Sequence, residues 1–110
     1  MPGRKADLGE LETLVMLAVL RLEEEASARR IREVVGTTGG RAISRGALYA
    51  TLSRLVRKAY LDQAVRDPGE GGRVAQHFAV SDLGLTVLRT SQARLHRMRV
   101  GLERVLELPS

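Results

Sequence analysis

The sequence predicts a mainly helical fold that contains one small β-hairpin. Three observations favour this class. Apolar residues recur at helical spacing in four segments, a period-two alternation follows one glycine-rich stretch, and 110 residues are enough for one compact core. The expected order is three helices, a two-stranded hairpin and a long terminal helix.

The first helix is expected to begin at Leu8, after a flexible tail formed by residues 1–7. Steps of three and four residues separate its main apolar positions, which are Leu8, Leu11, Leu14, Val15, Ala18 and Leu22. Several residues between them are also apolar, so the helix is apolar on nearly every side. Such a helix is either central in its own domain or lies between two chains.

Two further helices are expected to follow. Ser27 is a suitable N-cap for the second, which carries Ile31, Val34 and Val35 and ends at the "GTTGGR" stretch of residues 36–41. Ser44 is a suitable N-cap for the third. The apolar positions of the third helix share one face, and they are Leu48, Leu52, Leu55 and Val56.

A β-hairpin is expected after the third helix. Residues 60–65 include Tyr60, Leu61, Ala64 and Val65, which are typical of an extended segment. The stretch "RDPGEGGR" at residues 66–73 is rich in turn formers, and "VAQHFAVS" at residues 74–81 alternates like a second strand. The hairpin therefore has a long tip.

The terminal helix is expected to run from Ser81 or Asp82, either of which can cap it, to about Leu106. Leucines at 88, 95 and 102 lie seven residues apart, and residues 91, 98 and 105 follow each of them by three, which forms a short heptad seam. So small a chain cannot bury this seam alone, so a homodimer is expected. The predicted dimerisation residues are Leu11, Val15, Leu88, Leu95, Met98, Leu102 and Val105.

Composition excludes several classes of protein. The chain has no cysteine, which excludes disulfides and thiol catalysis, and His77 and His96 are too few and too far apart for a metal site. No apolar run approaches the roughly 18 residues that cross a bilayer, and the acidic start is not typical of a signal peptide. The serines have no histidine or acid at a catalytic spacing. We therefore expect a cytoplasmic protein that is not an enzyme and has no cofactor.

The charge pattern favours a polyanionic partner. The net charge is +5 and the isoelectric point is near 10.7. No acidic residue stands between Val34 and Leu61, and three helices followed by a two-stranded wing are the order of a winged helix-turn-helix, whose third helix enters the DNA major groove. Residues 8–81 are thus the predicted DNA-binding domain, and residues 82–110 are the C-terminal dimerisation helix. The predicted contacts with double-stranded DNA are Ser44, Arg45, Gly46, Tyr49, Thr51, Arg54, Arg57, Lys58 and Arg73.

Some of these assignments have alternatives. Gly46 either lets a sugar-phosphate strand approach closely or marks a loose helix start. Tyr49 points about 100° away from Leu48 and is expected to contact a phosphate, although a core position is the commoner fate of a helical tyrosine. Arg73 either enters the minor groove or is a solvated hairpin arginine. A rival function is a protein-interaction module whose basic face binds an acidic partner protein, and a more remote one is a subunit of an enzyme that binds a small molecule.

Three stretches carry a family resemblance. They are "LGELETLVMLAVL", "GALYATLSRLVRKAYL" and "DPGEGGRVAQHFAVSDLG", and together they resemble the PadR-like family of winged helix-turn-helix transcriptional regulators from about Leu8 to Thr86. The resemblance implies a homodimeric regulator, usually a repressor, with Tyr49 on the DNA-facing helix and Arg73 on the wing. Two-fold symmetry implies a pseudo-palindromic operator. Many members respond to a small molecule, so a small-molecule effector is a further expected partner.

The chain departs from the family pattern at several positions. Residues 75–81 replace the usual basic residues and tyrosines, which makes the wing strand less cationic. Ser27 and Ala28 replace a Tyr-Gly pair, and Ala59 stands where a glycine is common. The chain has no tryptophan, so a flat aromatic ligand would lack the stacking partner that relatives use.

Overall fold

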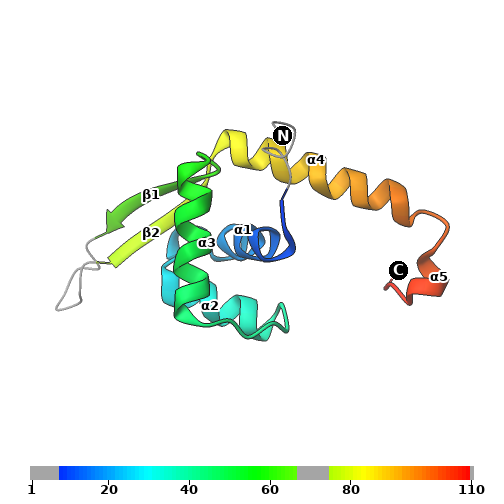
Figure 1. The fold of residues 1–110 in the computed structure, drawn as a ribbon, viewed down its shortest axis with the longest axis horizontal. Coiled ribbons are helices and arrows are strands. Elements are labelled where there is room, and N and C mark those ends of the chain that lie inside the picture. Colours follow the sequence, from blue (N-terminus) through cyan, green and yellow to red (C-terminus); the bar gives the residue numbers. More distant parts are fainter. Residues whose placement is uncertain (1–7, 67–74, 110) are drawn as a thin grey trace.

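The computed structural model describes residues 8–66 and 75–109 (Figure 1). In chain order the elements are α1 (Glu10–Leu22), the 3-10 turn η2 (Glu23–Glu25), α2 (Ala28–Thr37), α3 (Arg45–Arg57), β1 (Leu61–Arg66), β2 (Ala75–Val80), α4 (Asp82–Arg99) and α5 (Glu103–Leu106). Helices α1, α2 and α3 pack together, the hairpin extends from one side, and α4 leads away from them. The predicted class, mainly α with one hairpin in a winged helix-turn-helix, is confirmed.

The core lies where α1, α2, α3 and the hairpin meet, with α1 at its centre. Val15 and Met16 of α1 are fully buried, and α3 buries Leu48, Leu52 and Leu55 against them, as the spacing of these leucines predicted. Each buried side chain of this size contributes roughly 1.5–3 kcal/mol relative to exposure. The other buried apolar residues are Ala18, Val19, Ala26, Ile31, Val35, Tyr60, Leu61, Phe78 and Leu88.

Serine hydroxyls begin three of the helices, as predicted for Ser27 and Ser44 and offered for Ser81. Ser27 accepts a hydrogen bond from the backbone N–H of Arg30 at 3.3 Å, Ser44 from that of Ala47 at 3.0 Å, and Ser81 from that of Gly84 at 2.9 Å. Each bond satisfies an amide at the start of a helix that has no partner within the helix. These caps fix where α2, α3 and α4 begin.

The hairpin is attached to the helices at its base. Its antiparallel register runs from Leu61 opposite Val80 to Arg66 opposite Ala75. On the outer side of β2, the N–H of Phe78 donates to the carbonyl of Ala26 at 3.0 Å, and an isolated bridge joins His77 to Ser27. The base of the wing is therefore tied to the segment that begins α2.

Helix α3 ends in a left-handed turn at Ala59, whose φ is 67°. The N–H of Ala59 donates to Val56 and that of Tyr60 donates to Leu55, each at 2.9 Å, which is the Schellman pattern. Glycine usually occupies this position because a Cβ is unfavourable there. The departure from the family pattern at Ala59 thus puts strain at the end of α3.

The same turn positions α4. The Ser81 hydroxyl donates to the carbonyl of Ala59 at 2.6 Å, so the residue before α4 is bonded to the end of α3. A Cβ at Gly84 would collide with the carbonyl of Tyr60. Glycine at 84 therefore lets the first turn of α4 pack directly against the junction between α3 and β1.

Two expectations, one about the terminal helix and one about the dimer interface, are wrong. The terminal helix ends at Arg99 and not near Leu106, because Val100 leaves the helical conformation and Gly101 has a φ of +90°. Val15 and Leu88 were predicted to lie in the dimer interface, but they are 0% and 3% exposed in the core of a single chain. A side chain buried in its own core has no surface to offer to a second copy.

The strain at Ala59 can be measured. Ala59→Gly is expected to raise the free energy of unfolding by about 1 kcal/mol, because glycine adopts the left-handed conformation without a Cβ clash. Ala50→Gly is the matched control, since it makes the same change at an exposed position inside α3 and should lower that free energy by about 1 kcal/mol. Urea denaturation measures both. Changes of the same sign would contradict the account.

Candidate nucleic-acid interface

One face of α3 points away from the core and carries no acidic residue. Its exposed members are Arg45, Gly46, Tyr49, Ala50, Ser53 and Arg57, and Tyr49 is 51% exposed. Steps of three and four residues keep these positions on one side of the helix. We call this set the outward face. Its cations and hydroxyl groups suit a surface that meets phosphates and the edges of bases.

The start of α3 is open to an approaching partner. A Cβ at Gly46 would meet only the Ser44 hydroxyl oxygen, at 3.9 Å, so packing within this chain does not require glycine there. Glycine near a helix start still costs roughly 1 kcal/mol relative to alanine. The Ser44 side chain is exposed, although its oxygen already accepts the amide of Ala47.

Thr51 is not on the outward face, and its prediction as a free donor is wrong. Thr51 is 1% exposed, and its hydroxyl donates to the carbonyl of Ala47 one turn earlier at 2.8 Å. It lies between Leu48 and Leu55 on the core side. Ser53 is the exposed hydroxyl residue instead, and counting two helical turns on from Gly46 would have found it.

Arg54 and Lys58 face α1 rather than lying free. The Glu12 carboxylate oxygen Oε2 accepts from Arg54 Nε at 3.4 Å and from Lys58 Nζ at 2.9 Å. The Glu12 side chain is 8% exposed, whereas those of Arg54 and Lys58 are 43% and 32% exposed. Of the predicted cations of α3, only Arg45 and Arg57 are on the outward face. Arg73 lies outside the described residues.

The environment of Glu12 favours its charged form. Burial of the carboxylate works against ionisation, but the backbone N–H of Gly9, which donates at 3.0 Å, outweighs it together with Lys58 and Arg54. The pKa of Glu12 therefore lies below its usual value. The carboxylate is an anchor that holds the start of α1 against the end of α3.

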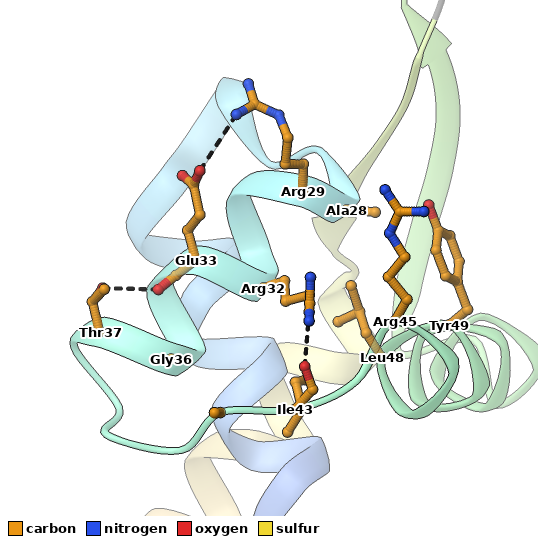
Figure 2. Close-up of a pocket in the computed structure, with 11 residues that line it drawn as sticks. Ala28, Arg29, Arg32, Glu33, Gly36, Thr37, Ile43, Arg45, Leu48 and Tyr49 are labelled. Atoms are coloured by element: carbon orange, nitrogen blue, oxygen red, sulfur yellow. Dashed lines mark hydrogen bonds and ion pairs between the residues drawn. The ribbon is translucent and has the colours of Figure 1, made fainter.

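A pocket of about 430 Å³ opens between α2 and α3 beside Arg45 and Tyr49 (Figure 2). Figure 2 shows Arg29 and Arg32 along its α2 side. Arg32 Nε donates to the carbonyl of Ile43 at 2.7 Å, and Arg29 pairs with Glu33 at 3.3 Å. These two arginines lie beside the start of α3, where Arg32 adds a positive charge and the charge of Arg29 is balanced by Glu33. The sequence reasoning missed them because it assigned DNA contacts to the third helix and the wing only.

Apolar side chains are exposed along the C-terminal arm formed by α4 and α5. Met98 and Val105 are 72% and 78% exposed. Of the other predicted dimerisation residues, Leu95 and Leu102 are also exposed, and Leu11, which belongs to α1, is half-buried against the core. From Asp82 onward, the exposed apolar residues that the prediction did not name include Leu83, Val100, Leu106 and Leu108.

Two further functional classes find no support in the described part of the chain. Within residues 8–66 and 75–109, no group of acidic and histidine side chains is arranged to hold a metal ion. None of the described helices combines the length and apolar character needed to cross a bilayer.

Comparison with solved structures shows which fold this is. A PadR family regulator from Eggerthella lenta is 28% identical, with a TM-score of 0.66 over 91% of this chain and 88% of its own. A PadR-like transcription factor from Bacteroides fragilis is 22% identical, with a TM-score of 0.72 over 94% of this chain and 93% of its own. The fold is that of PadR-like regulators, as the sequence resemblance implied.

A ligand-bound regulator is also similar. PcaV from Streptomyces coelicolor, solved with its natural ligand, is 26% identical, with a TM-score of 0.68. The match covers 88% of this chain and 62% of PcaV. No protein-family model and no curated protein matches the sequence.

The Glu12 anchor predicts a pH dependence of stability. Because the pKa of Glu12 is lower in the folded chain than its usual 4.5, its contribution is complete above that value and is lost as pH falls through the folded pKa. The melting temperature of the wild type should therefore fall more steeply between about pH 5 and pH 3 than that of Glu12→Gln. Thermal denaturation monitored by circular dichroism measures both slopes.

Glu10→Gln is the control, since Glu10 is in the same turn of α1 but its side chain is 79% exposed. This variant should keep the wild-type slope. If Glu12→Gln keeps it as well, the carboxylate is not the anchor described.

Proposed function

We propose that this chain, which has the fold of PadR-like transcriptional regulators, binds a pseudo-palindromic DNA operator as a homodimer and represses transcription. The observation that carries the proposal is the outward face of α3, where Arg45, Tyr49, Ser53 and Arg57 are exposed and no acid intervenes. A recognition helix needs such donors because phosphate contacts position it and base-edge contacts select the sequence. DNA binding would place the protein in the cytoplasm, and the proposal includes no catalytic activity.

In this proposal the outward face of α3 contacts the DNA groove, and the arginines of the pocket beside it contact the flanking phosphates. Gly46 and the capped start of α3 allow the helix to approach the groove closely. The Arg45 side chain has no hydrogen-bond or ion-pair partner among the described residues. Arg29 and Arg32 on α2 lie where a flanking phosphate strand would pass if α3 enters the groove. Tyr49 can donate its exposed hydroxyl to a phosphate.

The C-terminal arm supports the homodimer. Large apolar side chains are exposed repeatedly along it, among them Leu95, Met98 and Val105, and such side chains mark an association site where they gather into one patch. The middle of α4 also lies beside the start of α1, where Leu8, Leu14 and Leu95 line a hollow of about 520 Å³. A two-fold dimer built on this arm would present two copies of α3 to successive major grooves.

A small-molecule effector is the remaining part of the proposal. PcaV, a similar regulator, has been solved with its natural ligand. By analogy, a ligand that binds one arrangement of the dimer better than another would shift the population that can bind DNA. The described residues include no tryptophan, so an aromatic ligand would have to use other side chains.

Selection of duplexes from a random pool, followed by titration at several salt concentrations, tests the function. DNA binding predicts enrichment of a two-fold symmetric sequence and an affinity that falls linearly on a log-log plot against salt. A weak salt dependence with every duplex, together with tight binding to an acidic protein, would favour the protein-interaction alternative.

Loss of the Arg45 side chain should lower the affinity for the selected duplex. Arg45→Gln is expected to weaken binding to the selected duplex by about 1–3 kcal/mol, because a charge-assisted contact is removed from the outward face. Arg89→Gln is the matched control, since it removes the same charge from an exposed position on α4. Gel-shift titration at fixed salt compares them. Equal affinities for the two variants would argue against the assigned face.

The dimer has its own test. Met98→Glu should convert the dimer into a monomer at micromolar concentration, because it puts a charge into an apolar contact. Val65→Glu is the control, since Val65 is 64% exposed on the hairpin. Sedimentation velocity gives the mass of each. A wild-type mass of one chain, or a Met98→Glu variant that stays dimeric, would contradict the proposed interface.

A further inference from the structure

Glu12 pairs with two of the four cations that lie between Arg45 and Lys58. Its Oε2 atom is 3.4 Å from Arg54 Nε and 2.9 Å from Lys58 Nζ. The carboxylate is 8% exposed and is held from behind by the amide of Gly9 at 3.0 Å. The long cationic side chains can reach solvent, but the carboxylate cannot follow them outwards.

These two cations are next to the proposed DNA surface. Arg54 follows Ser53 and Lys58 follows Arg57, so each lies about 100° around the helix from a member of the outward face. They line an open hollow of about 590 Å³ between the start of α1 and the end of α3. Arg41, on the rim of the same hollow, pairs with Glu10 at 3.0 Å. Each cation of the hollow therefore has an acidic partner from α1.

We propose that Glu12 is a specificity-determining residue that withholds Arg54 and Lys58 from DNA phosphates and so lowers the affinity for unrelated sequences. This inference rests on the proposed DNA binding. Phosphate contacts supply nearly all of the affinity for non-specific DNA, whereas specific binding also uses contacts to base edges. Withholding two cations therefore weakens non-specific binding in larger proportion than operator binding.

The geometry explains why the cations stay withheld. For either to leave Glu12, a nearly buried carboxylate would lose a charged partner, which is costly. A phosphate drawn into the hollow would also meet the negative charge of Glu12 itself. Arg45 and Arg57, in contrast, have no such carboxylate beside them among the described ion pairs. The outward face thus keeps both of its positive charges, whereas Arg54 and Lys58 share the single negative charge of Glu12.

The test is the salt dependence of binding to an unrelated duplex, measured by fluorescence anisotropy of a labelled oligonucleotide. Glu12→Gln should bind this duplex more tightly than the wild type at low salt, and its log-log slope should be steeper by about one to two, because up to two further phosphates are neutralised. Glu10→Gln removes the same charge from a carboxylate that is 79% exposed and pairs with only one cation of the hollow, Arg41, so it should steepen the slope by less than Glu12→Gln does. If the slope of Glu12→Gln does not exceed that of Glu10→Gln, the inference is overturned.

A second pair of variants does not depend on the folding of Glu12→Gln. In the wild-type background, Arg57→Gln should make the slope shallower by about 0.9, since it removes from the outward face a cation that has no ion-pair partner within residues 8–66 and 75–109. Lys58→Gln should change it little, because Lys58 is already paired with Glu12. Equal changes at 57 and 58 would overturn the withholding role.

The same titrations test the proposed DNA binding and the role of Glu12 separately. A wild-type chain that binds no duplex even at low salt would defeat the proposed function and this inference with it. A wild type that binds with a steep salt slope, but whose slope Glu12→Gln leaves unchanged, would keep the function and reject only the role of Glu12.

Discussion

The orientation of α3 depends on one nearly buried carboxylate. Glu12 accepts the amide of Gly9 at the start of its own helix and the charged groups of Arg54 and Lys58 at the end of α3. A charge in such a place is tolerated only where its partners satisfy it. Because those partners come from two helices, the ion pairs fix α1 against α3 on one side while the buried leucines of α3 fix it on another. The side of α3 that makes neither of these contacts is the outward face.

Much of this arrangement followed from periodicity. Local sequence patterns, which do not depend on the rest of the fold, predicted the order of elements, the core face of α3 and the serine caps. Thr51 was misplaced because its residue type was considered before its angle, and a buried threonine can satisfy its hydroxyl on the preceding turn. The end of α4 was predicted wrongly because the heptad spacing of apolar residues continues past Gly101, whereas the backbone conformation at Gly101 is not helical. The role of Glu12 was out of reach, since 42 and 46 residues separate it from its partners.

The fold also explains how a small chain can divide its surfaces. The Schellman turn at Ala59 and the close packing of Gly84 on Tyr60 direct α4 away from the body, which leaves its apolar residues exposed. The base of the wing is hydrogen-bonded to the segment that begins α2. That segment therefore positions both the hairpin and the α2 side of the pocket between α2 and α3. In the proposed function, association uses the arm, and DNA binding uses α3 with the arginines of α2. Arg54 and Lys58 instead hold α3 against α1 through Glu12.

The chain contains two tyrosines that test the central claim, which is that the outward face of α3 meets DNA. Tyr49 is 51% exposed on that face, and Tyr60 is 5% exposed in the core. The direct measurement is the nuclear magnetic resonance spectrum of ring-labelled tyrosine during titration with a selected duplex. The account predicts that the Tyr49 ring signals shift to saturation while those of Tyr60 stay almost unchanged. Saturated binding that leaves the Tyr49 signals in place would contradict it.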